Sequence, residues 1–477
     1  MRYLRIEAKR RLSAGEFASL HLAQLAIARE YGMASWAALK ERVEGASHAL
    51  AQVRWILSRF AAGPVPDEGE LRRHFADHYL RQVPPRTLTG LLSSVAGAEL
   101  VDVQAEALWV RARLGDLRIE AATEADPPYR LRGLRLYPLE TRVSDPRVAA
   151  PGSRTAGVVP EDAAAVAADS YAELGLVGLT VAGPGWVSVR GWADLDRGEV
   201  LTPEHRFPAY SITKLVTAVA VLRLVADGLV RLDDAANAYL RTIRLADGAV
   251  TVRELLSHTG GVDDPSPVFA DRVPDLVSVT GPVAPCGGVR GTFAYGHGGY
   301  ALLGQLIADL TGSRYEDAAT GLVLRPLGLT GSSFGPTGTP ITGHRLTDAG
   351  VFEPAPTPLS TMPAAGGLWT TAADLVRFGH AWSSLLPAAL AREALTPQAE
   401  RDDSPGGQAG LGWMLALPKD VAGHPGAGPG CSASLIIRPG QPGQTWAVLT
   451  NRAVLVEAVN ERLALPLTGV ESGGPAS

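Results

Sequence analysis

The chain has 477 residues, of which 44 are basic and 49 are acidic, so its formal net charge is −5. A chain of this length exceeds what one compact core normally organises, which predicts two or three domains, each able to bury enough apolar surface to be stable. The nearly balanced charge offers neither the basic stripe of a nucleic-acid-binding protein nor a polybasic membrane face, so we set both partner classes aside.

The first 141 residues predict helices followed by antiparallel strands. Residues 1–47 form a helical segment, because apolar residues recur at three-to-four spacing until Gly32 ends one helix and Ser35 caps a second through Val43. Residues 48–141 continue with runs that alternate apolar and polar residues, which is typical of strands half covered by helices. This small α+β domain is expected to have helices near 53–60 and 70–81 and strands near 107–114, 117–121 and 129–137.

A larger domain follows a linker. Residues 142–160 hold several prolines and glycines without periodicity, which is typical of a domain-crossing segment. In residues 161–465, strands occur only near the two ends of the domain, which indicates an α+β architecture. The expected strands are 177–182, 186–189, 434–437 and 446–450, and a last helix is expected at 455–463. Residues 466–477 are expected to form a flexible tail.

The sequence predicts a cytoplasmic protein without a membrane partner. No apolar run reaches the about 18 residues that span a bilayer. The best candidate, residues 215–230, is interrupted by Arg223 and Asp227. The first eleven residues carry charges throughout and lack the apolar core of a signal peptide.

Neither a metal nor an organic cofactor is expected. Two cysteines, Cys286 and Cys431, are too few for a disulfide framework, and neither has the neighbours of a zinc site. His74 and His78 have the i, i+4 spacing of helical metal ligands, but a third ligand and an adjacent glutamate are missing. We therefore expect reduced cysteines and no metal.

Ser211 and Lys214 are the strongest candidates for chemistry. Pro208 precedes them and an apolar sequence through Leu224 follows, so Ser211 is expected in the first turn of a long buried helix, with Lys214 on the same face. The helix N-terminus favours negative charge on the serine oxygen, and burial disfavours the ammonium form of the lysine. Only four of the 44 basic residues are lysines, and only Lys214 follows a serine by three positions. The pattern predicts an activated nucleophile, with a helix-capping serine and a surface lysine as the alternative.

Five short segments occur in a fixed order along the larger domain. They are Tyr210–Lys214, Leu255–Gly261, Tyr295–Tyr300, Gly366–Leu375 and His424–Gly426. Their order and spacing resemble the landmarks of the penicillin-recognising serine hydrolases, which comprise class C β-lactamases, D,D-carboxypeptidases and related family VIII-type esterases and acyltransferases. The resemblance covers about residues 161–465 and implies a β-lactamase/transpeptidase-like fold, with an antiparallel sheet flanked by an all-helical subdomain.

The resemblance implies a role for each matching residue. Ser211 would attack a carbonyl carbon to form an acyl-enzyme, and Lys214 and Tyr295 would share the proton. The backbone N–H groups of Ser211 and Ala427 would form the oxyanion hole, and His424 would tune the tyrosine. The expected substrate-binding residues are Pro425, Gly426 and Trp413, with packing in the core as the alternative for the tryptophan.

Two departures from the family pattern affect the expected function. Pro425 replaces a hydroxyl residue that binds the substrate carboxylate in penicillin- and peptidoglycan-processing members, and proline offers neither a hydroxyl nor an N–H. We therefore expect a serine hydrolase or acyltransferase acting on an ester, amide or thioester of a small metabolite, with β-lactamase or D,D-peptidase activity as an alternative. Gly296 and His297 stand where a serine and an asparagine are usual, which leaves an inactive binding or scaffold protein as a second alternative.

Three further positions have two interpretations each. His297 either titrates near neutral pH and adds a proton shuttle beside Lys214, or passively replaces the hydrogen bond of an asparagine. His258 lies in a turn, where an imidazole more often satisfies backbone groups than takes part in catalysis. The loop from Asp263 to Arg290 either covers the site or is a solvated connection.

The region before the larger domain resembles the steroid-isomerase-like α+β modules found ahead of some serine-hydrolase domains. No polar cluster is evident there, so we assign it no catalytic residue. It is expected to shape one rim of the cleft or to mediate a homodimer. The expected ligand of the whole protein is a small-molecule acyl substrate.

Overall fold

The computed structural model divides the chain into two compact units. One unit comprises residues 1–113 and 117–136, and the other comprises residues 114–116 and 137–477. The described residues are 2–30, 35–62, 66–83, 85, 88–89, 92, 95, 98–104, 107–112, 115–124, 126–149, 151–401, 407–416, 420–441, 444–454, 456, 459–460 and 462–463.

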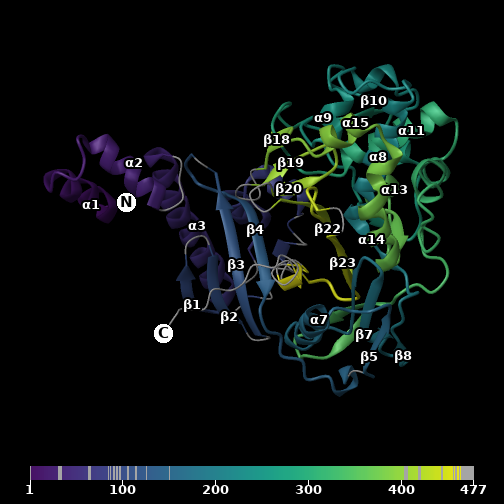
Figure 1. The fold of residues 1–477 in the computed structure, drawn as a ribbon, viewed down its shortest axis with the longest axis horizontal. Helices are drawn as coiled ribbons and strands as arrows, with labels where there is room; N and C mark the ends of the chain where they lie inside the picture. The colour runs from purple at the N-terminus through teal and green to yellow at the C-terminus, as the bar shows by residue number, and fades with distance from the viewer. Residues whose placement is uncertain are drawn as a thin grey trace. The chain divides into compact units, whose positions relative to one another are not determined.

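The first unit combines helices with a four-stranded sheet (Figure 1). Its helices are α1 (Arg2–Ser13), α2 (Leu20–Glu30), α3 (Trp36–Ala62), α4 (Glu68–His74) and α5 (Asp77–Gln82). Its strands, in the spatial order β1-β2-β3-β4, are β1 (Glu99–Gln104), β2 (Ala107–Ala112), β3 (Gly115–Thr123) and β4 (Leu131–Pro138). The core joins α3 to the sheet through buried residues such as Val53, Phe75 and Leu131. The steroid-isomerase likeness of this unit stays a prediction.

Helix α3 differs from the expectation. The sequence predicted a short helix ending at Val43 and a separate helix from Val53, whereas α3 runs without a break over 27 residues. The connecting residues contain alanines and leucine with Gly45 as the only weak helix former, and one glycine costs only about 1 kcal/mol relative to alanine. The predicted boundary at residue 47 therefore falls inside one helix.

The second unit is built on a ten-stranded sheet in the order β18-β19-β20-β21-β22-β23-β6-β7-β5, with β8 beside β7. These strands are β5 (Ser153–Ala156), β6 (Gly178–Gly183), β7 (Trp186–Asp194), β8 (Glu199–Val200), β18 (Ala399–Glu400), β19 (Gln408–Ala409), β20 (Met414–Ala416), β21 (Val421–Gly428), β22 (Cys431–Ile437) and β23 (Thr445–Thr450). The helices are α7 (Glu161–Glu173), α8 (Thr213–Ala226), α9 (Val252–Leu256), α10 (Leu276–Thr280), α11 (Gly298–Thr311), α12 (Tyr315–Ala319), α13 (Pro363–Gly366), α14 (Ala372–Ala381) and α15 (Ala388–Ala394).

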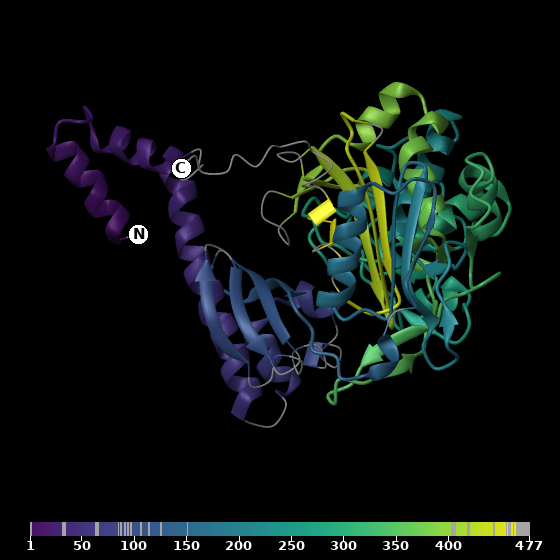
Figure 2. The same cartoon turned by 60° about the horizontal axis from the view of Figure 1, so that its bottom comes forward.

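Short strand pairs and a small three-stranded sheet complete this unit. They are β9 (Phe207–Pro208), β10 (Arg244–Leu245), β11 (Phe269–Ala270), β12 (Val283–Ala284), β13 (Ser333–Phe334), β14 (Gly343–Leu346), β15 (Phe352–Ala355), β16 (Leu359–Ser360) and β17 (Leu368–Thr370). In the main sheet β23 pairs antiparallel with β6, so strands from opposite ends of the domain are neighbours. Figure 2 shows the C-terminal strands, in yellow, beside the blue strands near residue 180. The predicted α+β arrangement is confirmed.

Helices cover both faces of the main sheet. Along β23, Trp446 and Val448 belong to the apolar cluster that includes α7, whereas Ala447 and Leu449 belong to the cluster that includes α8 and α14. Since successive side chains of a strand point to opposite faces, the two clusters lie on opposite sides of the sheet. This double burial explains why β23 reads as an unbroken apolar run in the sequence.

The segment predicted as a linker also contributes to the sheet. Within residues 142–160, β5 pairs antiparallel with β7, and all four of its residues are exposed. A short, exposed edge strand lacks the apolar alternation by which strands are recognised in a sequence. The predicted last helix, 455–463, lies partly outside the described residues, and the predicted tail, 466–477, lies wholly outside them.

Among the described helices, none has the length and apolar character needed to cross a lipid bilayer. In the first unit, His74 stacks on Trp55 with 3.5 Å between ring centroids, and its Nδ1 lies 2.9 Å from Gln52 Oε1. The side chain of His78, the second residue of the possible metal pair considered above, lies outside the described residues.

Candidate active site

Ser211 lies in a strained turn at the start of α8. Tyr210–Ile212 form a single 3₁₀ turn, and α8 begins at Thr213, so Ser211 precedes the helix rather than occupying its first turn as predicted. Tyr210 has a φ of 45°, a conformation that non-glycine residues seldom adopt. The Tyr210 hydroxyl donates to the Pro429 carbonyl oxygen at 2.7 Å, and the Thr213 hydroxyl donates to the Tyr210 carbonyl oxygen at 2.6 Å. These bonds hold the turn that carries Ser211.

Lys214 is fully buried next to the serine. Its Nζ lies 3.3 Å from Ser211 Oγ, 3.1 Å from His297 Nδ1 and 3.1 Å from the Ala365 carbonyl oxygen. Desolvation lowers the pKa of Lys214 to about 7, although the Asp264 carboxylate acts in the opposite direction. A lysine with this pKa is partly a neutral amine near pH 7 and can accept a proton from the serine.

Tyr295 lies at the centre of a group of aromatic and basic side chains. Lys214 Nζ is 4.9 Å from the centroid of its ring. The rings of His258, His424 and His297 lie 4.7, 5.8 and 6.0 Å from it, centroid to centroid. The structure therefore brings together the residues predicted from three distant segments: Ser211, Lys214, Tyr295, His297 and His424.

His297 begins α11 and is held there by a carboxylate. Asp264 Oδ1 accepts the backbone N–H groups of both His297 and Gly298, the latter at 2.8 Å. Desolvation, followed by the charges of Lys214 and His424, keeps the pKa of His297 well below its ordinary value. The imidazole is therefore neutral around pH 7, which favours the passive interpretation, a hydrogen-bonding replacement for asparagine, over a second proton shuttle.

His424 lies on β21 and is also neutral. Desolvation and the charge of Lys214 lower its pKa to about 3. Its Nδ1 lies 2.6 Å from the Pro425 carbonyl oxygen, and since a carbonyl can only accept, this assigns the proton to Nδ1. Nε2 is then an acceptor, and within the described part of the chain it has no hydrogen-bond partner.

Strand β21 runs closely past the nucleophile. A Cβ atom at Gly426 would lie 2.1 Å from the Ala209 carbonyl oxygen and 3.4 Å from the Ser211 backbone nitrogen. Only glycine allows this approach. The adjacent Ala427 is exposed, and Pro425 is partly exposed on the same strand. The close approach of β21 to Ser211 is compatible with an oxyanion hole formed by the N–H groups of Ser211 and Ala427, which stays a prediction.

Trp413 packs in the core of the second unit. It is 1% exposed, and its ring centroid lies 4.9 Å from that of Trp382. The preceding Gly412 fits against α8, where a Cβ atom would lie 2.5 Å from the Ala218 Cβ atom. This burial favours core packing over the substrate-binding role that the sequence also allowed for Trp413.

Asp264 and His258 contribute more to the site than the sequence indicated. The Asp264 carboxylate accepts the N–H groups at the start of α11 and, within the described part of the chain, is the negative charge that raises the pKa of Lys214. The His258 ring packs between Tyr295 and Tyr300, at 4.7 and 5.0 Å between centroids, and its Nδ1 accepts the Gly296 N–H at 3.4 Å. Both residues lie in connections without periodicity, so their neighbours could not be inferred from the sequence.

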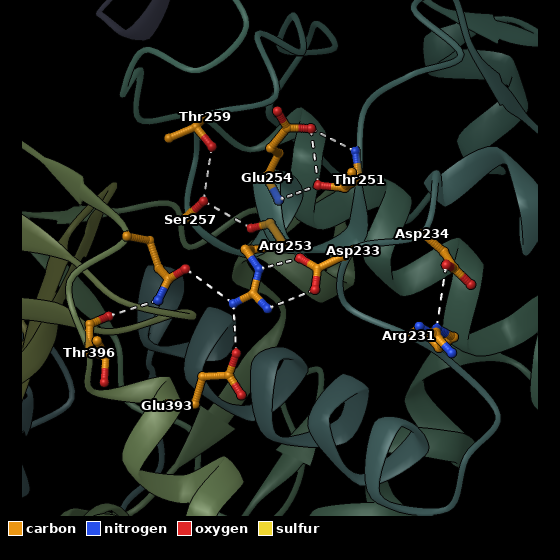
Figure 3. Close-up of polar contacts among 11 residues, drawn as sticks. Arg231, Asp233, Asp234, Thr251, Arg253, Glu254, Ser257, Thr259, Glu393 and Thr396 are labelled. Atoms are coloured by element: carbon orange, nitrogen blue, oxygen red, sulfur yellow. Dashed lines mark hydrogen bonds and ion pairs between the residues drawn. The ribbon is translucent and has the colours of Figure 1, made fainter.

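A polar network fixes the turn that carries His258 (Figure 3). Thr251 and Glu254 form a capping box at the start of α9. Arg253, in the same first turn, pairs with Asp233 at 2.6 Å and with Glu393 at 2.8 Å. Beyond α9, Ser257 and Thr259 hydrogen-bond to one another at 3.0 Å on either side of His258. The histidine, with a φ of 59°, is thus held from both sides.

Comparisons with known proteins agree with this geometry. The family model described as Beta-lactamase matches residues 159–468. Penicillin-binding protein 4 of Amycolatopsis lactamdurans is 31% identical over 294 residues, which cover 54% of this chain and 75% of that protein. Esterase EstB of Burkholderia gladioli is 32% identical over 171 residues, 30% of this chain and 42% of EstB. The crystal structure of SurE matches with a TM-score of 0.53 and 29% identity, covering 66% of this chain and 78% of SurE.

The matches define the fold of the second unit. Residues 159–468 have the β-lactamase/transpeptidase-like α+β fold, and the region before them adds helices and a small antiparallel sheet. The chain spans three quarters of the penicillin-binding protein but under half of the esterase.

The substitution Asp264→Asn should lower the pKa of Lys214. The carboxylate stabilises the ammonium form, so without it desolvation lowers the pKa of Lys214 further. The amide oxygen of asparagine can still accept the two N–H groups at the start of α11. The chain has only four lysines, so the ¹³Cε signal of Lys214 can be followed in lysine-labelled protein and identified with Lys214→Met. The Asp263→Asn variant is the matched control and should leave the midpoint in place. An unchanged midpoint in Asp264→Asn would contradict the coupling.

The substitution His297→Asn should leave the midpoint of the pH–rate profile unmoved. A neutral histidine and an asparagine both offer Lys214 one acceptor, so neither adds a titration near pH 7. The profile is measured with a chromogenic short-chain ester. His297→Leu removes the acceptor and should lower kcat/KM by about tenfold, the size of one buried hydrogen bond. A shifted midpoint in His297→Asn would show that His297 itself titrates.

Proposed function

Because the chain belongs to the beta-lactamase family, we propose that it is a serine hydrolase or acyltransferase that works through an acyl-Ser211 intermediate. The observation that carries this proposal is the distance of 3.3 Å between Ser211 Oγ and the buried Lys214 Nζ, whose pKa is about 7. A nucleophile needs a base within hydrogen-bond reach and with a pKa near the working pH, and this pair meets both conditions.

In the first step Ser211 Oγ attacks the carbonyl carbon of the substrate while Lys214 Nζ takes the serine proton. The oxygen of the carbonyl becomes negative in the tetrahedral intermediate, where the N–H groups of Ser211 and Ala427 would stabilise it. The bond to the leaving group then breaks, and the leaving group receives the proton that Lys214 took. Tyr295, whose ring lies 4.9 Å from Lys214 Nζ, is placed to share this proton transfer.

In the second step a water molecule or another nucleophile attacks the acyl-Ser211 ester. Lys214 accepts the proton of the incoming nucleophile and returns it to Ser211 Oγ as the ester bond breaks. The enzyme is regenerated and the acyl group leaves as an acid or as a new ester or amide. Hydrolysis and acyl transfer thus use the same groups of this chain and differ only in the nucleophile.

The proposed substrate is an ester, amide or thioester of a small metabolite. Pro425 supports this choice, because it supplies no hydroxyl or N–H to hold a carboxylate beside the scissile bond. The family contains both a penicillin-binding protein and an esterase among the relatives of this chain. β-Lactamase or D,D-peptidase activity is the second candidate, and the 31% identity to a penicillin-binding protein is the observation that favours it.

A binding or scaffold protein without catalysis is the third candidate. The changed residues Gly296 and His297 are its only support. Against it, the nucleophile, the buried lysine and the tyrosine occupy one site, and His297 still reaches Lys214 at 3.1 Å. A scaffold would gain nothing from a fully buried amine, which lowers stability unless it is well paired.

A fluorophosphonate probe should label Ser211 and abolish turnover of short-chain esters. Mass spectrometry of the peptide that contains residues 210–214 locates the adduct. Ser211→Ala should lose labelling and lower kcat by at least about 10³-fold, whereas Ser313→Ala, an exposed serine far along the chain, serves as the control and should behave as wild type. Labelling or turnover undiminished in Ser211→Ala would exclude the proposed mechanism. Faster hydrolysis of a chromogenic cephalosporin than of the esters would favour the second candidate.

A further inference from the structure

A cavity in the second unit lies apart from the catalytic residues. Its volume is about 460 Å³, and it is bordered by α14, the 3₁₀ turn Trp382–Leu385, α15 and the loop ends of β22 and β23. This volume is within the range of about 300–1,000 Å³ that is typical of pockets for small molecules. Ser211, Lys214, Tyr295, His297 and His424 are not among its lining residues.

The wall of the cavity is apolar and its charged groups are all basic. Trp382, Leu386, Leu395 and Ile437 line it, and the first two are 3% and 8% exposed. The ionisable lining residues are His380, Arg392 and Arg438, and the described lining holds no aspartate or glutamate. A ligand with an apolar body and a negative head would therefore complement the cavity in both respects.

The two arginines differ from the neighbouring Arg253 in their pairing. Over the described ranges, neither Arg392 nor Arg438 forms an ion pair, whereas Arg253 pairs with two carboxylates, one of them Glu393 of α15. The Nε of Arg438 is buried and makes no hydrogen bond there. A buried N–H group without an acceptor lowers stability, and a charged N–H group does so more strongly. An oxyanion bound here would accept hydrogen bonds from guanidinium N–H groups that have no acceptor in the described protein.

We propose that this cavity binds a small amphiphilic carboxylate, such as a medium-chain fatty acid. The carboxylate accepts hydrogen bonds from the guanidinium groups of Arg438 and Arg392, which present planar pairs of N–H donors suited to two oxygens. The hydrocarbon chain lies against Trp382, Leu386 and Ile437. This site is independent of the proposed acyl-enzyme chemistry, because it shares no residue with it.

The cavity is connected to the catalytic helix through packed side chains. Trp382, which lines the cavity, packs on Trp413, and the neighbouring Gly412 fits so closely on α8 that a Cβ atom would lie 2.5 Å from the Ala218 Cβ atom. A ligand in the cavity therefore changes the surroundings of two tryptophans in contact. Their fluorescence provides a readout of binding that does not depend on catalysis.

Octanoate is a suitable probe, with 1-octanol as the uncharged match of the same length. We expect octanoate to change the tryptophan fluorescence of the full-length protein saturably, and calorimetry to give the same affinity with about one site. Arg438→Gln should weaken binding by at least about tenfold, as should Arg392→Gln, because each removes a charge-assisted hydrogen bond. Arg325→Gln removes an exposed arginine outside the cavity and should leave the affinity unchanged.

Two further measurements separate this cavity from the catalytic site. Protein whose Ser211 is blocked by a fluorophosphonate should bind octanoate as well as untreated protein. The Arg392→Gln variant changes an exposed side chain, so its fold can be verified by circular dichroism even where Arg438→Gln is destabilised. The proposal is overturned by equal binding of 1-octanol, by loss of binding in the blocked protein, or by wild-type affinity in folded Arg392→Gln.

Discussion

The desolvated amine of Lys214 is the constraint around which the second unit is arranged. Moving an ammonium group out of water is unfavourable by several kcal/mol. A lysine with 0% exposure therefore needs polar groups around its amine. The turn before α8 supplies Ser211 Oγ, the N-cap residue of α11 supplies His297 Nδ1, and α13 supplies the Ala365 carbonyl oxygen. Thr217 donates to the neighbouring Ala364 carbonyl oxygen at 2.7 Å, which fixes α13 on α8. The start of α11 and helix α13 are thus both held against α8 by polar contacts with its side chains.

The same helix is joined to the sheet through the nucleophile turn. Gly426 brings β21 against the backbone of Ala209 and Ser211, while Tyr210 reaches the Pro429 carbonyl oxygen at the end of that strand. The Ala209 N–H donates to the Leu368 carbonyl oxygen of β17 at 2.8 Å. The positive φ of Tyr210 is therefore enforced from two strands that lie far from it in the sequence. Strain of this kind persists only where the surroundings determine it, and here they determine the position of Ser211.

Features that depend on residues a few positions apart could be predicted from the sequence. Contacts between segments that are distant in the chain could not. The spacing of Ser211 and Lys214 and the apolar runs of β6 and β23 are local patterns, and the structure has Lys214 Nζ 3.3 Å from Ser211 Oγ and β23 paired with β6, although Ser211 precedes the helix that was expected to contain it. Asp264 was not recognised, because its importance comes from N–H groups that lie 33 and 34 residues further along the chain. The length of α3 and the edge strand β5 were missed for a different reason: a single glycine does not end a helix of otherwise adequate helix formers, and an exposed edge strand lacks apolar alternation.

The group of basic residues around Tyr295 carries little charge despite its composition. Desolvation comes first in lowering the pKa values of His258, His297 and His424, and the charge of Lys214 comes second for all three. Lysine has by far the highest intrinsic pKa of these groups, so the charge that the group carries near neutral pH is on the protonated fraction of Lys214, while desolvation and that charge together keep the three imidazoles neutral. Replacing an asparagine by His297 therefore adds no second charge to the site. Lys214 is then the group of the cluster that titrates close to pH 7, and its neutral form lies 3.3 Å from the Ser211 hydroxyl whose proton it would accept.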